Sequence, residues 1–283
     1  MPPSQELKAL VSQIPDPDKN GTYVNLDEAK IAAIDKTVAE LRKGGPAAVA
    51  GLIDLLVDPA AGDDTKPHYT LYLWAVRASA PGEDQARAEF ASAVAAQLAA
   101  DRPKAVRRYL IEQLQVAGGK EVAEALGKAL PEADLCDTAA RALAAIGGEA
   151  AAGQLLAALP KVQGRSRLSV LKKLALLRVP AAGEAFQAAL ADGDADVRIA
   201  AAWGIARLAA ASAAQAMLQA ADAHEGWERI NITDACMALA EALQAAGKKD
   251  AAAGIWRHMV QRRSEPSTLH IRQAAERALA AAK

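Results

Sequence analysis

The amino-acid sequence predicts an all-α protein, an α–α superhelix in which about seven helix pairs stack into a right-handed solenoid. Three observations lead to this prediction. First, 52% of the 283 residues are hydrophobic but only 4% are aromatic, and alanine dominates, which favours closely packed helices over a sheet. Second, apolar residues recur at helical spacing. Third, this spacing itself returns about every 30 residues, which is the length of one helix pair.

The N-terminal part is expected to contain a lead-in or cap over residues 1–26, followed by one continuous solenoid domain over residues 27–283. Two helices are then predicted on either side of Gly44-Gly45-Pro46, where turn formers interrupt the helical pattern. Their apolar faces consist of Ile34, Val38 and Leu41, and of Val49, Leu52, Ile53 and Leu56. A loop over residues 58–67 is expected before the next helix.

From residue 106 onward, the first helix of each pair carries apolar residues at steps of four, four and three, which places them on one helix face. Five copies show this pattern: Val106, Leu110, Leu114 and Ala117; Leu135, Ala139, Leu143 and Ile146; Val197, Ala201, Ile205 and Leu208; Ile232, Cys236, Ala240 and Leu243; Ile271, Ala275, Leu279 and Ala282. A partial copy contains Val170, Leu174 and Leu177. One pair cannot bury both of its apolar faces alone, so neighbouring pairs are expected to stack into one core.

A break and a second, shorter helix are predicted after each of these helices. The second helices carry Val122, Leu126 and Leu130; Leu155, Leu156 and Leu159; Phe186 and Leu190; and Met217 and Leu218. Gly118-Gly119 and Gly147-Gly148 occupy the same place in adjacent repeats, where a left-handed backbone that glycine tolerates is expected to end the first helix. Pro180 takes the corresponding turn in the next repeat.

The segment from Asp192 to Gly204, with the sequence DGDADVRIAAAWG, resembles the HEAT-repeat signature. The resemblance implies structural roles for Asp194, Asp196 and Arg198: the turn aspartate caps its helix, and the arginine hydrogen-bonds an aspartate of a neighbouring repeat. The shorter period is more similar to bacterial HEAT-like repeats of the phycobilin-lyase type. This resemblance covers the chain from about Asp27 and implies an architecture rather than an activity.

One candidate metal site lies in the lead-in. Asp16, Asp18 and Asn20 are placed at alternate positions, as at the start of a calcium-binding loop, and Gly21 takes the sixth position. The twelfth position is Asp27, which is one methylene shorter than the glutamate that normally binds calcium there. The alternative interpretation is a turn followed by an aspartate that caps a helix.

A candidate partner-binding surface lies in the segment from residue 161 to 178, which contains no carboxylate. Its predicted members are Arg165, Arg167, Lys172, Lys173 and Arg178. These side chains are suited to an acidic partner or an anion. The alternative is that they only solvate the outer face of the helix that buries Val170 and Leu174.

The remaining candidates are expected to be structural. Trp74, Trp203, Trp227 and Trp256, together with Tyr69 and Tyr72, are predicted to pack in the core or between repeats. An exposed tryptophan on the solenoid surface is the alternative that gives a binding anchor. Cys136 and Cys236 are expected to be buried thiols, and the four histidines lack the spacing of metal ligands.

Composition limits the classes of function. The formal net charge of −1 gives no general attraction for nucleic acid or for an anionic membrane surface, and charged residues interrupt every long apolar stretch before it reaches membrane-spanning length. No catalytic residue or cofactor is predicted. The leading hypothesis is a non-catalytic interaction scaffold or adaptor that binds a protein or peptide on its curved surface.

Two alternatives remain open. One is a lyase-type or chaperone-like HEAT subunit, and the other is the binding module of a larger exported enzyme. Deoxyhypusine hydroxylase-like proteins are a poorer fit, because they hold iron with repeated His-Glu pairs and this chain contains only His224-Glu225. The expected location is cytoplasmic, or exported with the signal peptide absent from this chain.

Overall fold

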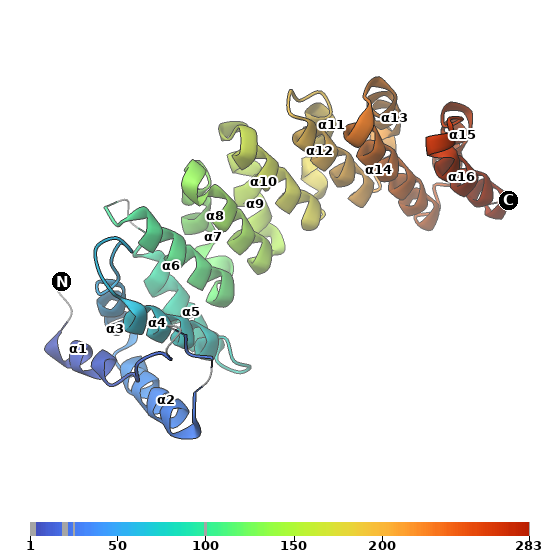
Figure 1. Cartoon of the computed structure of the whole chain (residues 1–283). Helices are drawn as coiled ribbons and strands as arrows, with labels where there is room; N and C mark the ends of the chain where they lie inside the picture. Colours follow the sequence, from blue (N-terminus) through green and yellow to red (C-terminus); the bar gives the residue numbers. More distant parts are fainter. Residues whose placement is uncertain (1–3, 19–21, 25, 99–100, 283) are drawn as a thin grey trace. The chain divides into compact units, whose positions relative to one another are not determined.

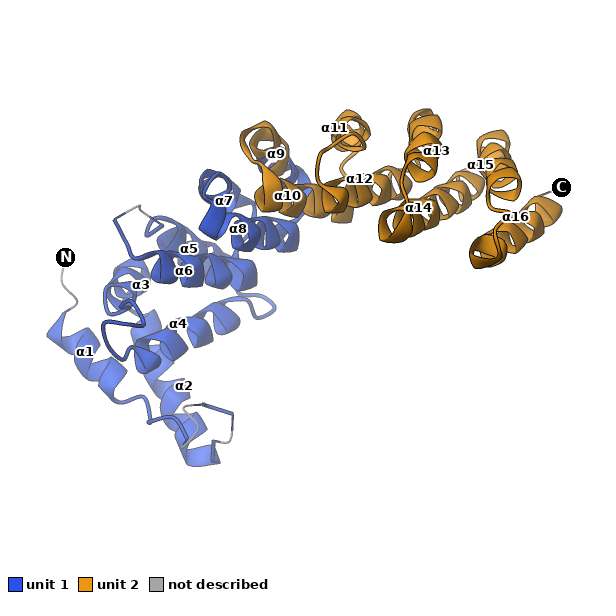
Figure 2. Cartoon of the chain, turned by 45° about the horizontal axis from the view of Figure 1, so that its top comes forward, with its two compact units in different colours: residues 1–154 blue, residues 155–283 orange. Residues whose placement is uncertain are grey.

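The computed structural model describes residues 4–18, 22–24, 26–98 and 101–282. Within these ranges the chain forms sixteen α-helices, five short 3₁₀ helices and no strand (Figure 1). It divides into two compact units, residues 1–154 and residues 155–283 (Figure 2). The predicted all-α architecture of repeated helix pairs is confirmed, while the number of pairs and the handedness stay predictions. None of the described helices combines the length and apolar character that crossing a bilayer requires.

The first unit begins with a short helix and continues in helix pairs. Its helices are α1 (Gln5–Ser12), α2 (Glu28–Arg42), α3 (Gly45–Ile53), α4 (Thr65–Ala78), α5 (Asp84–Ala95), α6 (Lys104–Ala117), α7 (Ala123–Ala129) and α8 (Ala133–Ile146). Helix α9 (Gly148–Ala158) crosses the boundary between the units. Helix α4 starts at Thr65, so the predicted loop ends before residue 65 rather than at residue 67.

The second unit alternates strictly between two layers of helices. Its helices are α10 (Gly164–Leu176), α11 (Gly183–Ala189), α12 (Ala195–Arg207), α13 (Ala214–Ala223), α14 (Gly226–Ala245), α15 (Lys249–Arg262) and α16 (Leu269–Ala281). Helices α10, α12, α14 and α16 form the first layer, and α11, α13 and α15 form the second (Figure 2). Helices α6 and α8, which are the first helices of their pairs in the first unit, are also called first-layer helices below. Short 3₁₀ helices join or extend the pairs at Lys120–Val122, Leu159–Lys161, Pro180–Ala182, Ala211–Ala213 and Pro266–Thr268.

The repeated apolar face is the core. In α6 the four predicted residues, Val106 to Ala117, are buried, and in α14 the four from Ile232 to Leu243 are buried as well. The final helix differs, because in α16 only Ala275 is buried. The face that the periodicity predicts therefore forms most of the core. The exceptions among the five complete copies are Ile146 and Leu208 at the ends of their faces, which are half-buried, and three of the four predicted residues of the last helix.

The lead-in packs against the first helices of the chain. Ile14 is buried with Ile34 and Val38, and Tyr23 stacks on Tyr69 with 3.7 Å between ring centroids. These contacts attach Ile14 and Tyr23 of the lead-in to α2 and α4. The boundary at residue 27 and the single domain over residues 27–283 stay predictions.

The turns between helices follow the glycine prediction only in part. Gly147 and Gly148 have left-handed backbones, with φ of +68° and +71°, as predicted. The prediction is wrong for Gly118, which is extended with φ −71°. A Cβ at Gly118 would collide with the carbonyl oxygen of Leu114, so close backbone approach, and not a left-handed conformation, explains that glycine.

Two non-glycine residues take the left-handed position in the second unit. Arg178 follows α10 with φ 51°, and Ala209 follows α12 with φ 48°. The N–H of Ala210 donates a hydrogen bond to the carbonyl of Ile205 at 3.2 Å, which closes the last turn of α12. This conformation costs an L-residue roughly 1–2 kcal/mol, which the cap offsets.

Candidate functional site

An arginine at the fourth position links successive first-layer helices. It recurs as Arg107 in α6, Arg167 in α10, Arg198 in α12, Arg229 in α14 and Arg272 in α16. The first four of these pair with a carboxylate near the start of the next first-layer helix. The pairs are Arg107–Glu132, Arg167–Asp192, Arg198–Glu228 and Arg229–Glu265. This repeated pairing holds neighbouring repeats in register.

The pair in the HEAT-like signature is bidentate. Arg198 Nε donates to Glu228 Oε1 at 2.5 Å, and Nη2 donates to Oε2 at 2.7 Å. The resemblance implied an aspartate partner, so this expectation is corrected: the partner is a glutamate of the next repeat. Hydrogen bonds from Arg198 hold the pKa of the Glu228 carboxyl below its ordinary value. Asp194 caps α12 as implied, because its side chain accepts the N–H of Asp196 at 2.8 Å.

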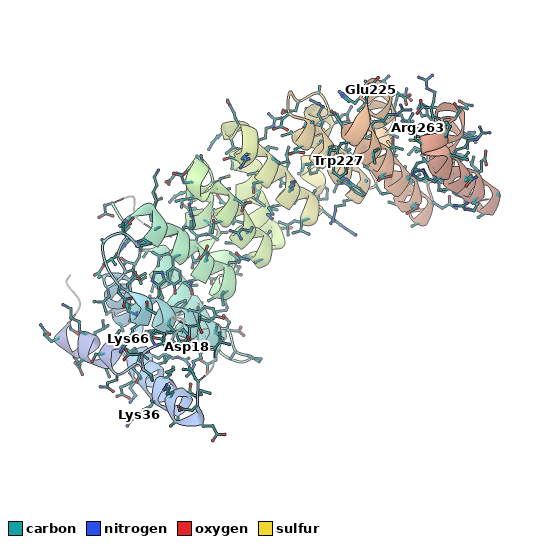
Figure 3. The ribbon with its side chains drawn as sticks, viewed as in Figure 1. Asp18, Lys36, Lys66, Glu225, Trp227 and Arg263 are labelled. Atoms are coloured by element: carbon teal, nitrogen blue, oxygen red, sulfur yellow. The ribbon has the colours of Figure 1, made fainter. Side chains whose placement is uncertain are left out.

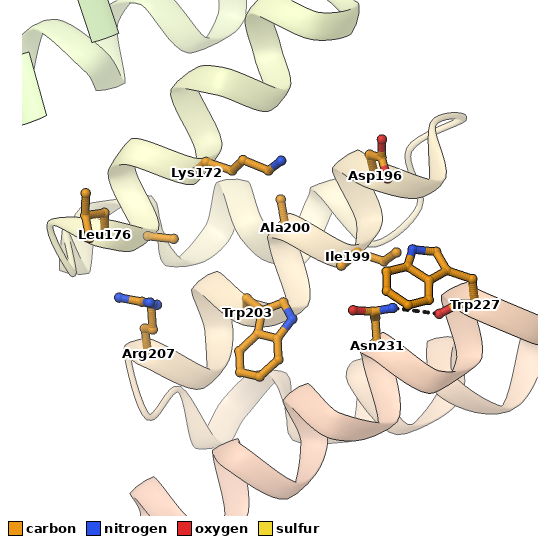
Figure 4. A pocket seen from close by; sticks show the side chains of 10 residues that line it. Lys172, Leu176, Asp196, Ile199, Ala200, Trp203, Arg207, Trp227 and Asn231 are labelled. Atoms are coloured by element: carbon orange, nitrogen blue, oxygen red, sulfur yellow. Dashed lines mark hydrogen bonds between the residues drawn. The ribbon is translucent and has the colours of Figure 1, made fainter. Parts of the chain in front are cut away.

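Beside this pair, three first-layer helices line an open groove of about 590 Å³, named here the tryptophan groove (Figure 4). Its lining residues are Lys172, Ala175 and Leu176 of α10; Asp196, Ile199, Ala200, Trp203 and Arg207 of α12; and Trp227 and Asn231 of α14. Ala175 and Ala200 are each 5% exposed and form its floor. The small alanine side chains leave the space that the larger residues surround.

The two tryptophans stand in solvent instead of packing in the core. Trp227 is 71% exposed and Trp203 is 36% exposed, whereas Trp74 and Trp256 are buried. The prediction that all four tryptophans pack is therefore correct for Trp74 and Trp256 and wrong for the two in the groove. Figure 4 shows the Trp203 and Trp227 indoles on neighbouring helices, with Asn231 donating to the backbone carbonyl of Trp227 at 2.9 Å.

The positions of these tryptophans within the repeat make them exceptional. Trp203 is the ninth residue of α12, and every other first-layer helix from α6 to α16 has a charged residue there: Glu112, Arg141, Lys172, Asp234 and Arg277. Trp227 is the second residue of α14, where α8, α10 and α12 carry Asp134, Arg165 and Asp196. Two solvent-facing positions thus hold the residue type most enriched at the centres of protein interfaces.

Charged residues flank the aromatic part of the groove. Lys172 and Arg207 are exposed, and neither has an ion-pair partner among the described residues. Asp196 is also exposed, and its carboxylate likewise forms no ion pair within the described part of the chain. The groove therefore offers two cations and one anion to a ligand.

The predicted basic surface is not brought together as one patch. Lys172 lines the tryptophan groove, but Arg167 pairs with Asp192 at 3.3 Å. Arg178 lines a second hollow beside Pro180 and Glu184, which shares Arg207 with the tryptophan groove. Arg165 is exposed at the start of α10, and Lys173 is half-buried. Of the five residues, Lys172 alone lines the groove, and the role of the set in partner binding stays a prediction.

The candidate calcium loop is described only in part, because Asn20 lies outside the described residues. Asp16 pairs with Lys66 at 2.8 Å, and Asp18 accepts the N–H of Thr22 at 2.9 Å (Figure 3). Asp27 caps α2 by accepting the N–H of Lys30 at 2.8 Å. These contacts are those of the turn-and-cap interpretation. No group of three or more metal-ligating side chains occurs in the described ranges.

A buried arginine forms a second polar feature of the second unit (Figure 3). Arg263, at the end of α15, is 1% exposed and donates to Asp222 Oδ1 at 2.7 Å. It also donates to the Ala221 carbonyl and to the Thr233 hydroxyl, both at 3.2 Å. Asp222 accepts a further contact from His258 at 2.9 Å. This cluster joins α13, α14 and α15.

Both cysteines are buried, as predicted. Burial raises the pKa of the Cys236 thiol to about 12, so this thiol stays protonated at neutral pH.

The chain was compared with known proteins. No protein-family model matches it, and no curated protein matches it. Among solved structures, an engineered protein aligns over 98% of this chain and 89% of its own at 16% identity, with a TM-score of 0.43. The complex of CpcE and CpcF of phycocyanin lyase from a Nostoc species aligns over 91% and 94% at 17% identity, with a TM-score of 0.36. Human deoxyhypusine hydroxylase aligns over 98% and 96% at 18% identity, with a TM-score of 0.35.

Proposed function

We propose that this protein is a non-catalytic interaction scaffold and that the tryptophan groove is its binding surface for a protein partner. One observation carries the proposal. Trp203 and Trp227 occupy solvent-facing positions at which the other repeats carry mostly charged residues, and they flank the same groove. An exposed tryptophan contributes little to the free energy of folding. In an interface, the same side chain buries a large apolar area at a low cost in conformational entropy.

The scaffold beneath the groove supports rigid presentation of these side chains. The Arg198–Glu228 pair fixes α12 against the start of α14, one residue from Trp227. Buried apolar residues of both helices lie on the opposite side, as Ile205 and Ile232 illustrate. A preformed groove loses less conformational entropy on binding than a flexible one.

The test is affinity capture from a lysate and an exported fraction of the native organism. The wild-type chain is compared with the double variant Trp203→Ala/Trp227→Ala. The matched control is Val116→Ala, because Val116 is 43% exposed on a first-layer helix outside the groove. A partner that the wild type and the control capture, and that the double variant loses, is the expected result. Capture that the double variant retains contradicts the proposal.

The competing prediction is a lyase-type or chaperone-like subunit, or the binding module of a larger exported enzyme. The lyase-type alternative differs in its readout, because a pigment or a metal would copurify with the wild-type chain. An absorption spectrum and elemental analysis of the purified protein detect either one. Copurification that the double variant retains would move the function away from the tryptophan groove.

A further inference from the structure

We infer that the occupant of the tryptophan groove is a linear segment of a protein partner with a fixed order of side chains: acidic at one end, apolar in the middle and basic at the other end. This inference rests on the proposed function and names the chemistry of the partner. It is carried by the order of residues along α12 and by three charged side chains that have no ion-pair partner among the described residues.

The order is set by one face of α12. Asp196, Ile199, Trp203 and Arg207 are its second, fifth, ninth and thirteenth residues, and all four line the groove. Eleven residues separate Asp196 from Arg207, which corresponds to about 16 Å along the axis and about three turns. The two charges therefore lie at opposite ends of one continuous stripe, with the apolar residues between them.

Neighbouring helices reinforce this order. Lys172 and Leu176 of α10 line the groove on one side of α12, and Trp227 of α14 lines it on the other (Figure 4). Figure 4 places Trp227 near the end of α12 that carries Asp196, and Leu176 near the end that carries Arg207. Each charged end thus has a large apolar side chain beside it.

The partner must supply charges of opposite sign. An apolar occupant would desolvate Lys172, Arg207 and Asp196 without compensation, because none of them has an ion-pair partner in the described ranges. An occupant with a carboxylate near Arg207 and a cation near Asp196 avoids this penalty at the two ends of the stripe. Two cations against one anion also favour an occupant with net negative charge. A span of about 16 Å corresponds to eleven residues of helix or to about five extended residues.

The experiment is selection of a displayed library of random twelve-residue peptides on the full-length chain. Individual peptides are then assayed against Trp203→Ala/Trp227→Ala, Lys172→Glu/Arg207→Glu and Asp196→Lys. Arg257→Glu is the matched charge control, because Arg257 is exposed on α15 in the other layer. Circular dichroism and urea unfolding confirm that each variant is folded.

The expected peptides carry Asp or Glu at one end, apolar residues in the middle and Lys or Arg at the other end. Their affinity falls at least about tenfold for the tryptophan variant and for Lys172→Glu/Arg207→Glu, and stays unchanged for Arg257→Glu. Replacing the acidic end of a peptide with lysine restores binding to Lys172→Glu/Arg207→Glu. Added salt weakens the binding.

Two other results separate this inference from the function on which it rests. Peptides that need the tryptophans but carry no acidic end, or that bind Lys172→Glu/Arg207→Glu as well as the wild type, overturn the charge order and leave the scaffold proposal standing. Absence of any peptide whose binding depends on the tryptophans overturns both.

Discussion

Replacing Arg263 with methionine is expected to destabilise the second unit by about 3 kcal/mol. Methionine keeps most of the volume and apolar contact of the side chain, so little cavity forms. The change removes one charge-assisted hydrogen bond to Asp222 and leaves the buried carbonyl of Ala221 without its donor. Breaking a buried ion pair on one side typically costs about 3–5 kcal/mol.

The lower end of that range applies because Asp222 is not fully isolated by the substitution. Its side chain is 18% exposed and keeps contacts with His258 at 2.9 Å and with Arg262 at 3.3 Å. Burial by itself would raise the pKa of Asp222, and Arg263 and His258 outweigh it and hold that pKa below the ordinary value. In the variant the Asp222 carboxylate therefore stays negatively charged at neutral pH but accepts fewer hydrogen bonds.

The assay combines urea unfolding with hydrogen exchange resolved by segment. Because each repeat contacts only its neighbours, faster exchange is expected in α13 to α16, while α6 to α8 stay unchanged. In a double-mutant cycle, Arg263→Met with Asp222→Asn should be at least about 1 kcal/mol less destabilised than the sum of the single variants. A loss below about 1 kcal/mol for Arg263→Met, or exchange that rises equally in α6 to α8, refutes the reasoning.

Three further predictions concern the same unit. Glu228 has a lowered pKa in the folded chain, so its pair with Arg198 stabilises the fold above the ordinary glutamate pKa of 4.5, and this stability is lost as the pH falls through the lower folded value. Arg198→Gln should therefore make the unfolding free energy depend less on pH between pH 3 and 6 than it does in the wild type. An equal pH dependence in the two proteins contradicts this prediction. Ala209→Gly should raise the unfolding free energy by about 0.5–1 kcal/mol, because glycine removes the left-handed strain at φ 48° and this gain exceeds its cost in unfolded-state entropy. A lower unfolding free energy of this variant, measured by urea unfolding, contradicts a strained cap. The raised pKa of Cys236 should make its alkylation by iodoacetamide at pH 8 much slower in the folded chain than in urea, as mass spectrometry measures, and equal rates contradict burial of the thiol.

The core follows from the sequence because it depends on local periodicity. Val197, Ala201 and Ile205 are spaced for one helix face, and all three are completely buried. At 100° per residue around the helix axis, Trp203 lies on the opposite side of α12 from these three residues. The same calculation for α14 places Trp227 opposite Ile232. The spacing therefore carries the signal for the exposed tryptophans, but aromatic residues are so commonly buried that residue type favours packing.

Other features depend on contacts between repeats, which no local pattern reveals. Arg167 and Lys172 are five residues apart and look alike in the sequence, yet one pairs with Asp192 and the other lines the groove. Gly118 and Gly147 occupy equivalent places but serve different backbone requirements, a close approach in one turn and a left-handed residue in the other. The next repeat decides the role of the two cations, whereas the backbone of the turn itself decides the role of the two glycines.

The arginine at the fourth helical position gives the array a direction and a unit of growth. In the three pairs of the second unit, the arginine belongs to the earlier repeat and the carboxylate to the later one, so a reversed repeat would place two like charges together. Arg167, Arg198 and Arg229 follow one another at intervals of 31 residues. Loss or duplication of 31 residues between α10 and α14 would keep the arginine at the fourth position of each first-layer helix. Such a chain can change the length of its binding surface in whole steps, one helix pair at a time.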